Sequence, residues 1–116
     1  MSFSLLYAEQ AQKEYDAIIA TAKAAFDKRK ANGTKKSSKC EGLAKQIKKT
    51  VDLLSQDPRH QGLATHKYDE IANPYDSKKP VFEAYAQNKT PGAYRVFWCY
   101  GPEKNDVTII ATTLHP

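Results

Sequence analysis

The chain has 116 residues, of which 27% are charged and 41% hydrophobic, a composition typical of one globular domain spanning residues 1–116. No apolar run approaches the ~20 residues that a membrane span needs, and the first eight residues lack a basic secretion signal, so neither membrane insertion nor export is expected. Cys40 and Cys99 lie 59 positions apart without a nearby ligand pair. We therefore expect reduced thiols in a cytoplasmic protein rather than a disulfide or zinc framework.

The net charge of +5 is concentrated in one segment. Residues 28–49 contain nine basic residues and a single acidic one, Glu41, and the rest of the chain is slightly acidic. Such a cluster is the electrostatic footprint of a protein that binds a polyanion or an acidic partner. It is equally typical of a solvated, lysine-rich helical hairpin, so both interpretations stay open.

The first half of the chain predicts a short strand followed by two helices. Residues 3–7 are apolar and precede an amphipathic stripe with helical spacing that runs to about Lys30. Gly33 is suited to the left-handed position after a helix end. Ser38 and Glu41 have the spacing of a capping box, so a second helix should begin near Lys39 and stop before Pro58.

Residues 57–80 show no periodicity and several turn signals. We expect a long surface connection with one short extended piece near residues 66–68. Connections of this length are uncommon in compact domains and are often functional.

Three strand-like runs follow, over residues 81–86, 93–100 and 107–112, and the segments between them are turn-rich and of hairpin length. The prediction is an α+β domain in which two N-terminal antiparallel helices pack on an antiparallel sheet, in the order β-α-α-β-β-β.

Arg95 is the most informative residue of these strands, because its neighbours are aromatic and β-branched. A guanidinium at such a position must be paired or must face a groove that receives an anion. Three consecutive strands would bring Glu83, Arg95 and His115 within reach of one sheet face.

This order of elements, the junction at residues 54–59 and the Tyr94-Arg95-Val96 strand resemble the RelE/ParE superfamily of toxins from toxin–antitoxin pairs. The resemblance implies that Arg95 contacts the scissile phosphate of RNA on the ribosome and that His115 acts in proton transfer. It also implies a cognate antitoxin as partner. Family ribonucleases often carry basic residues where this chain has Glu83 and Tyr85, and many extend beyond the position of Pro116 with a tyrosine or a helix.

RNA cleavage through the 2′-hydroxyl needs a base, an acid and cations near the phosphorus. We assign the base to Glu83 or His66, the acid to His115, and charge stabilisation to Arg95 and Lys67, with no metal or cofactor. Residues expected to contact RNA are Lys67, Lys45, Lys48, Lys49 and Arg59.

Each assignment has a simpler alternative. Glu83 would then only pair with Arg95 across neighbouring strands, His66 would be a polar loop residue, and His115 an incidental tail residue. Two other functions also stay open: a ParE-like protein that poisons DNA gyrase by protein–protein binding, and a non-enzymatic binding module on the same scaffold.

Overall fold

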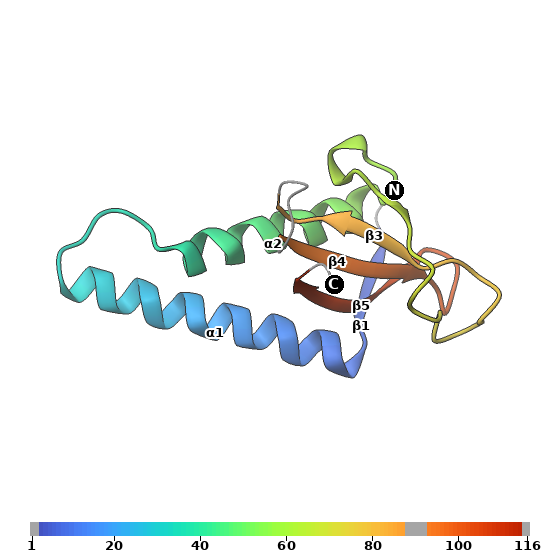
Figure 1. The fold of residues 1–116 in the computed structure, drawn as a ribbon, viewed down its shortest axis with the longest axis horizontal. Coiled ribbons are helices and arrows are strands. Elements are labelled where there is room, and N and C mark those ends of the chain that lie inside the picture. Colours follow the sequence, from blue (N-terminus) through green and yellow to red (C-terminus); the bar gives the residue numbers. More distant parts are fainter. Residues whose placement is uncertain (1–2, 88–92, 115–116) are drawn as a thin grey trace.

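The computed structural model describes residues 3–87 and 93–114 as two helices packed on a five-stranded sheet (Figure 1). The elements in chain order are β1 (Ser4–Tyr7), α1 (Glu9–Ala31), α2 (Lys39–Gln56), the 3-10 turn η1 (Gln61–Leu63), β2 (His66–Lys67), β3 (Phe82–Tyr85), β4 (Tyr94–Tyr100) and β5 (Asp106–Leu114). The predicted α+β class and the order of the main elements are confirmed. The expected extended piece near residues 66–68 is β2, while the predicted turn at residues 88–92 lies outside the described part of the chain.

The sheet has the strand order β1-β5-β4-β3-β2. β2, β3, β4 and β5 form the expected antiparallel meander, but β1 pairs with β5 in parallel, from Ser4 opposite Asp106 to Tyr7 opposite Ile109. The expectation of a purely antiparallel sheet is therefore wrong. Hairpins dictate antiparallel pairing only between consecutive strands, whereas β1 reaches β5 through the whole intervening chain, which leaves its direction free.

The predicted helix ends are confirmed. Gly33, two residues past the end of α1, has φ 71°, the left-handed conformation in which glycine is favoured. At the start of α2, the Ser38 hydroxyl accepts a hydrogen bond from the Glu41 amide, and the Glu41 carboxylate accepts one from the Ser38 amide at 2.8 Å. This capping box satisfies two backbone donors that the first turn of a helix leaves open.

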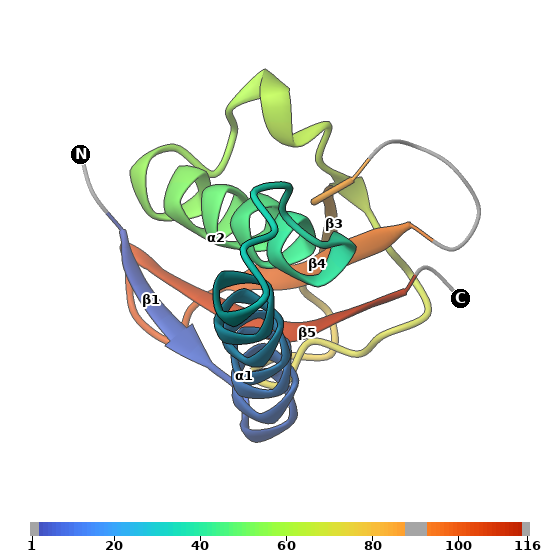
Figure 2. The ribbon, with the colours of Figure 1, turned by 90° about the vertical axis from the view of Figure 1, so that its left-hand side faces the viewer.

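The hydrophobic core lies between the two helices and one face of the sheet. Figure 2, which looks along the helices, shows them side by side next to β4 and β5. The buried core residues are Ala11, Val51, Leu54, Leu63, Ala84, Val96, Trp98, Val107 and Ile109. Because strand side chains alternate between faces, the neighbours of Ala84 and Val96 point to the opposite side, which we call the open face.

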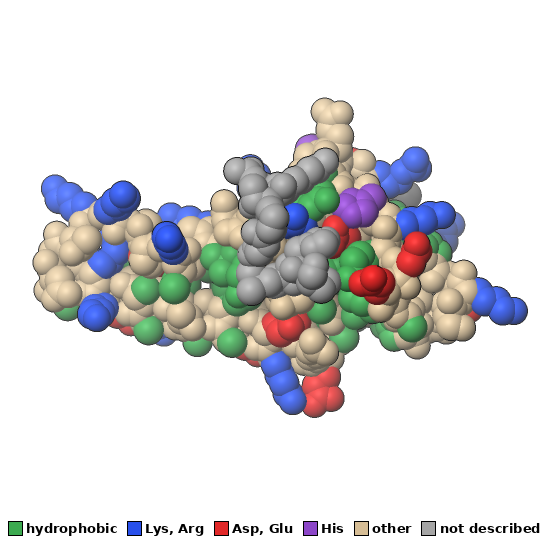
Figure 3. Space-filling model, viewed as in Figure 1, with side chains coloured by type: hydrophobic (Ala, Val, Ile, Leu, Met, Phe, Trp, Pro, Cys, Tyr) green, Lys and Arg blue, Asp and Glu red, His purple; other side chains and the backbone are tan. Residues whose placement is uncertain are grey.

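The helical hairpin extends beyond the sheet as an arm, in a molecule whose longest extent is 51 Å (Figure 1). Lys and Arg side chains project from this arm, as Figure 3 shows. One cation of the basic segment is neutralised, since Arg29 Nε lies 2.8 Å from the buried Glu41 carboxylate and ties α1 to α2. Within the described residues, neither helix combines the length and apolar character of a membrane span.

Candidate functional site

Four side chains of the neighbouring strands β3 and β4 define the site on the open face. Glu83 and Tyr85 alternate with core residues on β3, and Arg95 and Phe97 do so on β4. The register places Tyr85 opposite Arg95 and Glu83 opposite Phe97. The predicted common face for Glu83 and Arg95 is therefore confirmed, whereas His115 lies outside the described residues.

Arg95 is buried, with only 4% of its surface exposed. Its guanidinium carbon lies 4.0 Å from the centre of the Tyr85 ring, and its Nη1 donates a hydrogen bond to the Tyr94 carbonyl at 3.2 Å. The aromatic ring therefore covers the cation. Arg95 Nε is buried and has no hydrogen-bond partner among the described residues.

Glu83 is fully buried, and its carboxylate contacts the imidazole of His66 on the edge strand β2. The two residues are directly opposite each other in the β2–β3 register, and His66 Nε2 lies 2.8 Å from Glu83 Oε1. The His66 side chain is 47% exposed, whereas that of Glu83 is 0% exposed. Of the two candidates for the base, His66 can touch a substrate, and the Glu83 carboxylate can orient its ring.

Aromatic rings connect the Arg95–Tyr85 pair and the His66–Glu83 pair into one cluster. The rings of His66 and Tyr85 are 5.5 Å apart, and Tyr68, just beyond β2, packs on Phe97 at 4.8 Å. Burial raises the pKa of the Tyr68 phenol, helped by its hydrogen bond to Glu70 and by the negative charges of Glu70 and Glu83. The Tyr68 hydroxyl therefore stays protonated and neutral at physiological pH.

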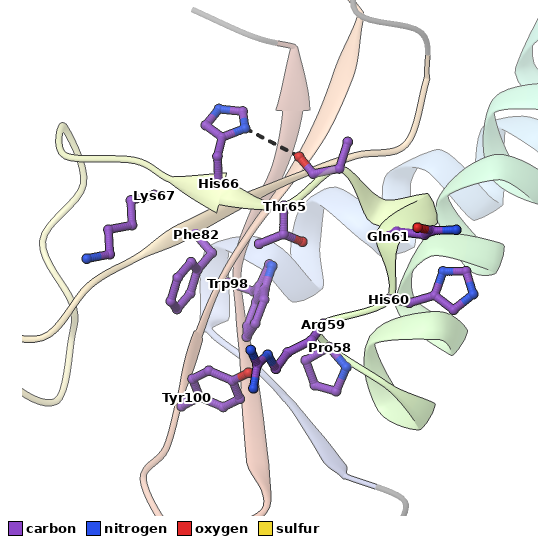
Figure 4. Close-up of a pocket in the computed structure, with 11 residues that line it drawn as sticks. Pro58, Arg59, His60, Gln61, Thr65, His66, Lys67, Phe82, Trp98 and Tyr100 are labelled. Atoms are coloured by element: carbon purple, nitrogen blue, oxygen red, sulfur yellow. Dashed lines mark hydrogen bonds between the residues drawn. The ribbon is translucent and has the colours of Figure 1, made fainter.

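Lys67, the second predicted charge stabiliser, lies on the sheet face opposite that of Arg95. It pairs with Phe82 in the β2–β3 register, and consecutive residues of a strand point to opposite faces. Lys67 lines a pocket on the helix side of the sheet together with Arg59, another predicted RNA contact, as the close-up in Figure 4 shows. We call this cavity the rear pocket, because it lies on the side of the sheet opposite the Arg95 guanidinium, although His66 is among the residues that border it.

The remaining predicted RNA contacts lie on α2. Lys45, Lys48 and Lys49, which we call the outer lysines, are exposed and line one shallow hollow with Asp52. Since α2 packs on the core face, a single RNA strand that touches both the outer lysines and Arg95 must pass around an edge of the sheet.

No group of three or more His, Cys, Asp or Glu side chains with metal-binding geometry occurs within residues 3–87 and 93–114.

Tyr85 is a neighbour of Arg95 that the sequence analysis does not assign to the site. The signal was present: Tyr85 and Arg95 are equidistant from Thr90 in a predicted hairpin, so they are expected opposite each other. The same count places Glu83 opposite Phe97, not opposite Arg95. No comparable signal exists for the His66–Glu83 contact, because the 66–83 connection is irregular.

The fold is that of the RelE/ParE toxins. Three solved structures superpose on 97–99% of this chain. The archaeal RelE–RelB complex from Pyrococcus horikoshii OT3 has a TM-score of 0.56 at 12% sequence identity, and a YoeB/ParE toxin from Agrobacterium tumefaciens has a TM-score of 0.59 at 10% identity. The E. coli RelBE toxin–antitoxin complex has a TM-score of 0.55 at 16% identity. The match covers 96%, 99% and 99% of those chains, respectively. No protein-family model and no curated protein sequence matches the chain. At such low identity the likeness concerns the fold.

Proposed function

We propose that the protein is the toxin of a toxin–antitoxin pair and acts as a metal-independent endoribonuclease on RNA, with the ribosome as the setting. The observation that carries the proposal is the contact between His66 and the Glu83 carboxylate on the same sheet face as the Arg95 guanidinium. A proton acceptor and a buried cation within one cluster are the groups that cleavage through a 2′-hydroxyl requires.

In the proposed reaction, the neutral His66 ring accepts the proton of the RNA 2′-hydroxyl on Nδ1, while its Nε2–H donates to Glu83, which holds the imidazole in place. The 2′-oxygen forms a bond to phosphorus, and the bond from phosphorus to the 5′-oxygen breaks. Arg95 stabilises the negative charge that develops on the phosphoryl oxygens. The acid that protonates the leaving 5′-oxygen is assigned to His115, from sequence alone. The products are a 2′,3′-cyclic phosphate and a 5′-hydroxyl end.

The partner of such a toxin is an antitoxin. Two of the matched structures are complexes of RelE-type toxins with RelB-type antitoxins. We propose that a cognate antitoxin neutralises this chain by covering the open face or the basic helical arm.

The test is single-turnover cleavage of mRNA on purified ribosomes, with the chemistry of the new ends identified. His66→Gln, Arg95→Lys and His115→Gln should each lower the rate by about 100-fold or more, since each loses a proton-transfer group or the planar cation. Glu83→Gln should lower the rate at unchanged RNA affinity, and Glu83→Asp should restore part of it. Glu103→Gln is the matched control, because Glu103 is an exposed carboxylate in the β4–β5 turn.

Expression of the chain in growing cells separates the rival functions. Growth arrest with cleaved mRNA supports the ribonuclease. Arrest with DNA-damage signalling, intact mRNA and unchanged toxicity of the Arg95 and His66 variants would instead indicate the gyrase-directed alternative. Normal growth would leave the non-enzymatic binding module.

A further inference from the structure

The rear pocket is a cavity of about 610 Å³ on the helix side of the sheet, at the end of α2. Residues of the 58–67 segment form one wall, and Phe82, Trp98 and Tyr100 form the other. Figure 4 shows His66 directed away from this cavity, while Trp98 and Phe82 lie side by side within it. His66 thus borders the pocket, but its ring points to Glu83 on the other side of β2.

An aromatic cluster forms the floor of the rear pocket. Trp98 is 1% exposed and stacks on Phe82, with ring centres 4.8 Å apart and planes inclined by 29°. Tyr100 meets the Trp98 ring edge-on at 5.0 Å and is itself 40% exposed. The half-exposed Tyr100 ring offers a flat apolar surface, while the two rings behind it fix its position.

The rim of the rear pocket is cationic. Arg59 and Lys67 are both exposed, and none of the described residues that line the cavity is acidic. Figure 4 shows the Arg59 guanidinium next to the Tyr100 ring, and burial raises the pKa of the Tyr100 phenol while the charge of Arg59 lowers it and that of Asp57 raises it. A positive charge therefore stands beside the flat surface.

We propose that the rear pocket binds a nucleotide. The base stacks on Tyr100, and the cations of the rim, Arg59 and Lys67, attract its phosphate. An acidic peptide would match the rim charge but not the flat aromatic surface, and an apolar ligand would leave both cations unused. The nucleotide is either free or part of an RNA strand that crosses β2, and the chemistry of recognition is the same for both sources.

Trp98 gives a direct assay, because it is the only tryptophan of the chain. Titration of the full-length protein with adenosine 5′-monophosphate should change the tryptophan fluorescence saturably, and calorimetry should give the same dissociation constant. Adenosine alone and inorganic phosphate alone should each bind at least about tenfold more weakly, because each makes half of the contacts. A 2′-O-methyl tetranucleotide, which cannot be cleaved, distinguishes the sources: affinity tenfold above that of the mononucleotide identifies an RNA strand, and equal affinity identifies a free nucleotide.

The double variant Arg59→Gln/Lys67→Gln should raise the dissociation constant by about tenfold or more, since it removes two charge-assisted contacts. The matched control is Lys23→Gln/Lys28→Gln, which removes the same charge from exposed positions of α1. Arg95→Lys should lose RNA cleavage but keep mononucleotide binding, so failure of this inference can be told apart from failure of the proposed function. The inference is overturned by absence of saturable binding, by an unchanged dissociation constant in the double variant, or by a glutamate-rich peptide that binds more tightly than the nucleotides.

Discussion

The contact between Arg95 and Tyr85 predicts a measurable coupling free energy. An exposed cation–π pair is worth about 0.5–1 kcal/mol and a desolvated one about 2 kcal/mol. With Arg95 at 4% exposure and Tyr85 half-buried, a double-mutant cycle of Arg95→Met and Tyr85→Leu should give a coupling of about 1–2 kcal/mol. Methionine is chosen because it fills the space of the arginine stem without creating a cavity.

The assay is urea and thermal unfolding at neutral pH of the wild type, both single variants and the double variant. For 116 residues the entropy of unfolding is about 0.24 kcal/mol/K, so a coupling of this size corresponds to about 4–8 °C in Tm. A second cycle that combines Arg95→Met with Tyr7→Leu is the control, because Tyr7 lies on β1 against Tyr15. A coupling with Tyr85 no larger than that of the control would show that the ring does not hold the guanidinium, and would remove the basis for its position in the site.

Three further predictions concern other parts of the fold. The hydrogen bond from the Ser38 backbone and the contact with Arg29 lower the pKa of Glu41 in the folded protein. Glu41 therefore stabilises the fold above its unfolded pKa of about 4.3, and this stability is lost as the pH falls through the folded pKa. Urea titrations should show Glu41→Gln less stable than wild type at pH 7, with a smaller difference in acid, and a pH-independent difference would contradict this. Neutralising the outer lysines should weaken RNA or ribosome binding and reduce the slope of log affinity against log salt by about 0.7 for each lysine that contacts a phosphate, whereas an unchanged slope would make them a solvated face. Burial raises the pKa of Cys99 to about 11, so iodoacetamide should label only the half-buried Cys40 in the native protein and both thiols after unfolding, as counted by mass spectrometry.

Local patterns were sufficient to predict the helices and the main strands. The ends of α2 follow from residues adjacent in sequence, namely the capping box at its start and Asp57-Pro58 at its end. The meander of β3, β4 and β5 follows from turn-rich segments of hairpin length. In both cases the physical cause acts over a few residues, so it is visible in the sequence.

The contacts that build the candidate site act over longer distances. His66 and Glu83 are 17 positions apart across an irregular segment, and only their register in the sheet brings them together. The parallel pairing of β1 with β5 also brings together residues from opposite ends of the sequence. No turn or periodicity encodes either contact, because both depend on how the whole core packs.

The long connection that showed no periodicity is what positions the proposed base. β2 has only two residues, so its pairing with β3 is too short to fix the His66 ring alone. The segment that follows supplies further anchors: the Tyr68 amide bonds to the Val81 carbonyl at 2.8 Å, and Tyr68 packs on Phe97. Farther along, the Tyr75 hydroxyl lies 2.9 Å from that of Thr108 on β5. These contacts hold the 68–80 segment against the sheet, and therefore hold β2 at the edge where His66 meets Glu83 on one face and Lys67 meets the rear pocket on the other.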